Sequence, residues 1–110
     1  MLKLTNVVVR DVRDRDGHKL GRLIEPHDGT ESGVIAAAQR ISDRMFVEYS
    51  DASNIESRLC ATDASGKPKW AVSPNLLHIA EVGTDEAAYI WGLKNRVTPE
   101  SKTVIPVCGL

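Results

Sequence analysis

Three histidines and one glutamate are the side chains of this sequence that could perform acid/base chemistry. His27 precedes Asp28, and a carboxylate beside an imidazole can orient the ring and fix its tautomer. No nucleophile in a recognisable turn accompanies this pair, so we interpret it as a loop dipeptide. His78 stands among apolar residues, where we expect a core histidine with a hydrogen-bond partner. Glu48 would serve as an acid or base only if it faced inward, and we expect it on the solvent face.

The acidic segment 11–17 does not match a calcium loop, although Asp11, Asp14 and Asp16 precede Gly17. With Gly17 at the sixth position of such a loop, the first and twelfth positions fall on apolar residues, and two carboxylates are missing. No two histidines are separated by the two or four positions that would direct both at one metal. We therefore predict no metal ligand and no cofactor, and a solvated hairpin tip at this segment.

All five aromatic residues fall between positions 46 and 91. If their strands are neighbours, these rings concentrate in one part of a sheet. That clustering has three interpretations: the rings fill the core, form a subunit interface, or line a concave ligand pocket. The candidate ligand-binding residues are Glu48, Tyr49, Trp70, His78, Tyr89 and Trp91.

Length and composition predict a single small globular domain over residues 1–110, since 42% of the chain is hydrophobic. The longest apolar run, residues 34–38, is far shorter than the roughly 20 residues of a membrane span. No secretory signal is recognisable, which predicts a cytoplasmic protein. Cys60 and Cys108 lack CxxC spacing, so we expect buried, reduced thiols, with one strand-to-strand bridge as the alternative.

Charge is unevenly distributed along the chain despite a net charge of −1. The basic residues of segment 10–16 alternate with aspartates, which disfavours binding to nucleic acid. Residues 23–56 hold seven acidic residues and two arginines, so a basic protein partner could be attracted to this region.

The first half of the chain predicts a β-hairpin followed by a helix. Residues 2–12 and 18–24 form the two strands around an Asp-Gly turn, with a bulge or a close approach by another backbone at Gly21. Thr30 is the expected N-cap of a helix over about 31–44, whose apolar residues fall on one stripe. Residues 45–50 are predicted as a short strand.

The second half predicts further strands. Residues 57–62 and 69–72 flank a turn that repeats the Asp-to-Gly arrangement of the first hairpin. Residues 77–82 and 87–93 form a third hairpin in the favoured interpretation, and a short helix ending near Gly83 is the alternative for the first arm. Residues 103–107 make a last strand with an edge proline.

Residues 87–93 carry apolar side chains on both faces of the expected strand, and one helix cannot cover two faces. The predicted fold is α+β, with six or seven short strands in a twisted, mostly antiparallel and barrel-like sheet and one main helix on one face. Excess apolar strand surface also predicts a homo-oligomer.

The predicted function is a non-catalytic binding or accessory module that self-associates and presents an aromatic-lined concavity to a small organic ligand or a protein partner. One alternative is a small metal-independent enzyme that pairs His78 or His27 with Glu48. The other is an immunity-type module that inhibits a basic protein through the acidic region 25–56.

Overall fold

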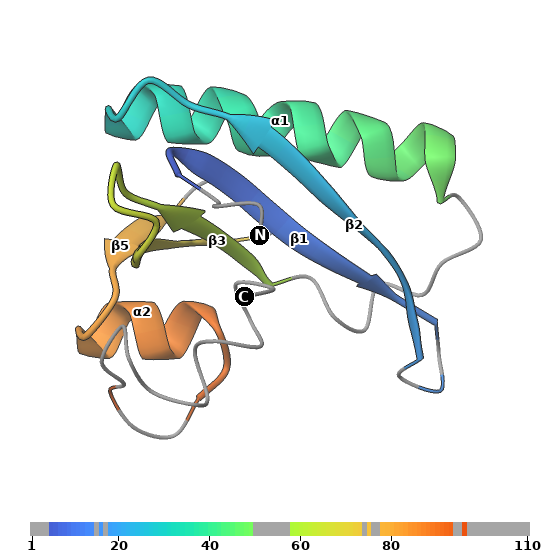
Figure 1. Cartoon of the computed structure of the whole chain (residues 1–110). Coiled ribbons are helices and arrows are strands. Elements are labelled where there is room, and N and C mark those ends of the chain that lie inside the picture. Colours follow the sequence, from blue (N-terminus) through green and yellow to red (C-terminus); the bar gives the residue numbers. More distant parts are fainter. Residues whose placement is uncertain are drawn as a thin grey trace.

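The computed structural model describes residues 5–14, 16, 18–49, 58–73, 75, 78–93 and 96. Within these residues, five antiparallel strands form an open sheet in the order β2-β1-β3-β4-β5, with one helix on each face (Figure 1). The elements are β1 (Val7–Arg13), β2 (Lys19–Pro26), α1 (Glu31–Glu48), β3 (Leu59–Thr62), β4 (Pro68–Val72), β5 (Ile79–Glu81) and α2 (Asp85–Ile90). The α+β class and the antiparallel sheet are confirmed. The barrel-like shape and the six or seven strands are not, and the expected strand over 103–107 lies outside the described residues.

The larger core lies between α1 and one face of the sheet. Alternate residues of β1, Val8 and Val12, point toward the helix and are fully buried. From α1, Val34, Ala38 and Ile41 complete this core at helical spacing, as the apolar stripe predicted. The amphipathic helix and the alternating strands therefore position each other.

Helix α1 extends one turn beyond the predicted end, so the strand expected over residues 45–50 is wrong. Met45 continues the buried stripe and is 7% exposed, whereas Phe46 and Val47 face solvent. A short apolar run fits strand and helix equally well, and packing of Met45 on the sheet decides for the helix. The N-cap is Thr30, as expected, because its side chain accepts a hydrogen bond from the backbone N–H of Gly33.

The opposite face of the sheet is covered by α2, which corrects the strand predicted over residues 87–93. Ala87 and Trp91 are one helical turn apart and are both buried against the sheet, while Tyr89 between them is 85% exposed. The side chain of Thr84 caps the helix by accepting from the N–H of Ala87. This second helix covers the face of the sheet opposite α1, so the expectation of a sheet that must curl or pack against another subunit is wrong.

The two long hairpins end in turns of the same construction. In the first, one carboxylate oxygen of Asp14 accepts the N–H groups of Asp16 and His18, and the Asp14 N–H donates to the His18 carbonyl. In the second, one carboxylate oxygen of Asp63 accepts the N–H groups of Ser65 and Lys67, and the Asp63 N–H donates to the Lys67 carbonyl. Each aspartate therefore fixes its own turn through local hydrogen bonds.

Strand β2 is an edge strand, and α1 protects part of that edge. Arg40 donates to the carbonyl of Pro26 at 2.7 Å, and Arg44 donates to the carbonyl of Ile24 at 3.4 Å. These carbonyls point away from β1 and would otherwise be free to pair with another strand. A register shift opposite the junction of Val12 and Arg13 further interrupts the ladder near the hairpin.

Cys60 is disulfide-bonded, which contradicts the expectation of a reduced thiol at this position. The only other cysteine of the sequence, Cys108, lies outside the described residues. In the part of the chain that the structure describes, no helix is long and apolar enough to cross a membrane.

Candidate functional site

The strongest candidate site surrounds His27, where the C-terminal end of β2, the start of α1 and the β3–β4 turn meet. The backbone N–H of His27 donates to the carbonyl of Asn6 at 2.9 Å. The ring lies edge-on to Trp70, with 5.7 Å between the ring centroids. Asn6 has a φ of 49°, a left-handed conformation that asparagine tolerates better than most residues. We call this region the His27 corner.

Both ring nitrogens of His27 are already hydrogen-bonded. Nε2 lies 2.8 Å from the carbonyl oxygen of Thr62, and Nδ1 lies 2.9 Å from the backbone nitrogen of Gly29. Since a carbonyl only accepts and a backbone N–H only donates, the neutral ring with its proton on Nε2 satisfies both bonds. His27 thus ties the loop before α1 to the end of β3, and neither nitrogen is free to move a proton.

Asp28 points toward the first turn of α1 and makes no hydrogen bond with the imidazole of His27. Its carboxylate accepts from the N–H and the hydroxyl of Thr30, the latter at 2.6 Å. The hydroxyl bond is the largest cause that lowers the pKa of Asp28. A Cβ at Gly33 would collide with this carboxylate, so any other residue there would force the Asp28 side chain to move.

Two hollows flank the loop that carries His27. The first, the helix-side cavity, has a volume of about 380 Å³ and is lined by Pro26, His27, Asp28, Gly33, Ala36 and Arg40. The second, the turn-side cavity, has a volume of about 390 Å³ and is lined by Asn6, Gly29, Asp63, Ala64, Ser65, Lys69 and Trp70. Both volumes fall in the lower part of the range that holds small organic ligands, roughly 300–1,000 Å³.

The turn-side cavity offers polar groups beside one aromatic ring. The ammonium group of Lys69 lies over the Trp70 ring, 4.5 Å from its centroid. Asp63 is held in its turn by the N–H and hydroxyl of Ser65, and the hydroxyl bond is the largest cause that lowers the pKa of Asp63. The cavity therefore presents a cation, an anion and an amide, which suits a small polar molecule.

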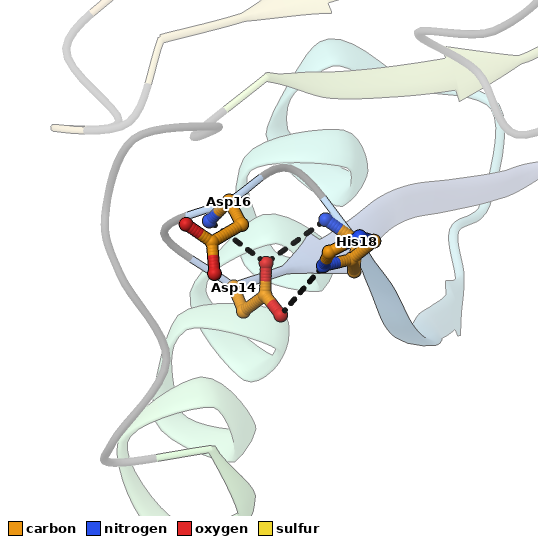
Figure 2. A group of neighbouring side chains, drawn as sticks. All are labelled: Asp14, Asp16 and His18. Carbon is orange, nitrogen blue, oxygen red and sulfur yellow. Dashed lines mark hydrogen bonds and ion pairs between the residues drawn. The ribbon is translucent and has the colours of Figure 1, made fainter.

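A second cluster lies at the tip of the first hairpin. Figure 2 shows the Asp14 carboxylate between Asp16 and His18, and the imidazole Nδ1 lies 3.4 Å from Asp14 Oδ2. Potential ligand atoms of the three residues all lie within 4.8 Å of one another. His18, however, is exposed, and the backbone N–H of His18 is the largest cause that lowers the pKa of Asp14. Asp63 builds the same turn without a second acid or a histidine, so the turn explains this arrangement without a metal.

The six candidate residues chosen from the sequence do not share one surface. Trp70 and Trp91 are buried on opposite faces of the sheet, 5% and 2% exposed. Tyr89 is exposed on α2, and the exposed His78 bonds through its backbone to Ser73. The core environment expected for His78 is therefore wrong.

Two of the six residues lie at the far end of α1. Glu48 is exposed, as expected, and accepts from Arg44 at 2.8 Å. Tyr49 packs against Gly21, and its hydroxyl occupies the space that a side chain at Gly21 would need. The close approach expected at Gly21 is thus made by a side chain rather than by another backbone.

Of the six candidate residues chosen from the sequence, only Trp70 lines one of the two described cavities. The other residues that line the turn-side cavity were not predicted. Asn6 and Lys69 reach the cavity because β1 and β4 are brought beside the loop after β2. Trp70 follows Lys69 directly in the sequence, but the two residue types alone do not show that the ammonium group lies over the ring. Comparisons of the chain with family models, curated proteins and solved structures find no match.

Proposed function

We propose that the protein is a non-catalytic binding module that holds a small polar organic ligand at the His27 corner. The observation that carries the proposal is the pair of hollows, about 380 and 390 Å³, on the two sides of one hydrogen-bonded loop. A rigid loop between two cavities is a suitable frame for ligand recognition, because little conformational entropy is lost on binding. Trp70 contributes the aromatic wall of the turn-side cavity.

Acid/base catalysis by a His/Glu pair has little support. His27 precedes α1 and Glu48 ends it, so an 18-residue helix, about 27 Å long, separates the two residues. His78 lines neither of the two described cavities. The alternative of a module that inhibits a basic protein is weakened by ion pairs, since Glu25 and Glu48 both lie within 4 Å of Arg44.

Ligand binding can be tested by filling each cavity separately. Ala64→Trp would occupy the turn-side cavity, Ala36→Trp the helix-side cavity, and Gln39→Trp adds the same bulk on α1 outside both linings. Backbone amide shifts of ¹⁵N-labelled protein are recorded during titration with free amino acids and nucleosides. In the wild type and in Gln39→Trp we expect shifts at the lining of the occupied cavity, Asn6 and Gly29 on the turn side or Asp28 and Gly33 on the helix side. These shifts should be lost in the variant that fills that cavity. Shifts that survive both filling variants would contradict the site.

We also propose self-association, through the last turn of α1 rather than through the sheet edge. Phe46 and Val47 are 82% and 78% exposed, and contact with a second copy of the chain would remove these two adjacent apolar side chains from water. The arginine-capped edge of β2 is a poor site for strand pairing. Sedimentation should show a concentration-dependent dimer for the wild type and a monomer for Phe46→Asp. A wild-type protein that stays monomeric at millimolar concentration would refute the proposed self-association.

The sequence predicts a cytoplasmic location because no secretory signal is recognisable, and the expected reduced thiols agreed with that prediction. A disulfide at Cys60 favours an oxidising compartment instead, because cytosolic disulfides are rare outside redox enzymes and thermophiles. We therefore propose that the protein functions where disulfides persist.

A further inference from the structure

Arg10 is a buried arginine without a counter-ion among the described residues. It lies in β1 opposite Leu23, and its side chain shares the α1-facing side of the sheet with Val8 and Val12. The residue is only 7% exposed, and its Nε atom is buried without a hydrogen-bond partner.

The other arginines near the first hairpin differ from Arg10 in this respect. Arg13 and Arg22 each lie within 4 Å of the Asp11 carboxylate on the opposite face of the sheet. On α1, Arg40 and Arg44 each have Glu25 at a similar distance. These four arginines thus each have a carboxylate within 4 Å, whereas Arg10, which is more buried than any of them, has none among the described residues.

An unpaired buried charge destabilises a fold, because the guanidinium loses hydration and gains no Coulombic attraction in return. Arginine cannot escape this cost by losing its proton at neutral pH. Burial lowers the pKa of Arg10, but an arginine still keeps its proton at neutral pH. A bound anion would remove the penalty, since a carboxylate can accept two parallel hydrogen bonds from one guanidinium.

We propose that Arg10 binds a small monocarboxylate, held by the guanidinium fork at the edge of the α1-side core. Low exposure limits the ligand to a few atoms. The apolar neighbours favour a singly charged anion over a dianion, because the cost of removing an ion from water rises with the square of its charge. The proposed site lies where the described pairing between β1 and β3 ends, because that pairing covers only Val8 and Val9 and Arg10 is the next residue of β1.

This site is independent of the His27 corner, since Arg10 lines neither of the two cavities there. Failure of one proposal therefore leaves the other unaffected. The two also differ in their readout, because the Arg10 site requires an anion and the His27 corner is tested with neutral and zwitterionic molecules.

Thermal unfolding at constant pH and ionic strength tests the Arg10 site, with sodium formate or acetate replacing sodium chloride. We expect the Tm of the wild type to rise with the logarithm of the carboxylate concentration once that concentration exceeds Kd. Arg10→Met should remove the rise, while Arg22→Met, which removes an accessible arginine of the same hairpin, should keep it. Arg10→Met is expected to fold, because an apolar residue of similar length replaces an unpaired charge.

Arg10→Lys provides a second variant that keeps the charge but lacks the planar fork, and it should reduce the rise. A wild-type Tm that does not respond to formate or acetate overturns the proposal. An equal response in the wild type and in Arg10→Met overturns it as well. A larger response to phosphate than to formate would overturn the assignment to a monocarboxylate.

Discussion

Trp91 and Tyr89 are two positions apart, and the effects of truncating each of them differ sharply between a helix and a strand. On a strand the two side chains would point to the same face and would share one environment. In α2 and its final turn, Trp91 is 2% exposed and Tyr89 is 85% exposed. The substitutions Trp91→Ala and Tyr89→Ala therefore test the correction of the fold directly.

The expected cost of Trp91→Ala follows from its burial and its hydrogen bond. A buried aromatic side chain removes about 150–250 Å² from water, which corresponds to about 4–6 kcal/mol at about 25 cal/mol per Å². Measured truncations of buried aromatic residues lie at about 3–5 kcal/mol, because the site partly collapses. Trp91 Nε1 also donates to the Leu59 carbonyl at 3.0 Å. We expect a loss of about 4 kcal/mol for Trp91→Ala and less than about 0.5 kcal/mol for the exposed Tyr89.

Urea unfolding followed by far-UV circular dichroism measures both free energies of unfolding. A domain of ordinary stability, about 5–15 kcal/mol, can be left marginal by Trp91→Ala, so Trp91→Phe serves as the second variant. Phenylalanine keeps most of the apolar contact but leaves the Leu59 carbonyl unpaired, which should cost about 1–3 kcal/mol. Similar losses for Tyr89→Ala and Trp91→Ala would refute the helical assignment of residues 85–90.

Three further predictions concern the turns, the sheet edge and the disulfide. The pKa of Asp63 is lowered in the fold, so its ionised form contributes stability above the unfolded value of about 3.9, and that contribution is lost as pH falls through the folded pKa. The Tm difference between wild type and Asp63→Asn should therefore narrow as pH falls from 7 to below about 4, and a constant difference would contradict the role of the charge. Replacing Arg40 and Arg44 together by Ala uncovers two edge carbonyls and should increase association on size-exclusion chromatography, whereas Gln39→Ala should not. Cys60 should resist alkylation in denaturant until a reductant is added, and its modification without reductant would contradict the disulfide.

Local sequence signals were sufficient to predict the elements that are stabilised by contacts between residues close together in the chain. The start of α1 was predictable, because Thr30 caps it and an apolar stripe follows at helical spacing. The two hairpin turns were predicted from the Asp16-Gly17 pair and from the Asp63-to-Gly66 segment, and in the structure Asp14 and Asp63 accept the hydrogen bonds that fix them. Stability at these positions depends on neighbours in the chain, which the sequence shows directly.

Tertiary contacts decided between helix and strand where the sequence fitted both patterns equally well. Residues 85–93 satisfy both strand alternation and helical spacing over a short span, and burial of Trp91 beneath β3 selects the helix. The last turn of α1 was misassigned for the same reason, because only the packing of Met45 on the sheet distinguishes the two choices. The His27 corner is also a product of the fold. Its imidazole bonds to Thr62, 35 positions away, and no local pattern encodes a contact at that separation.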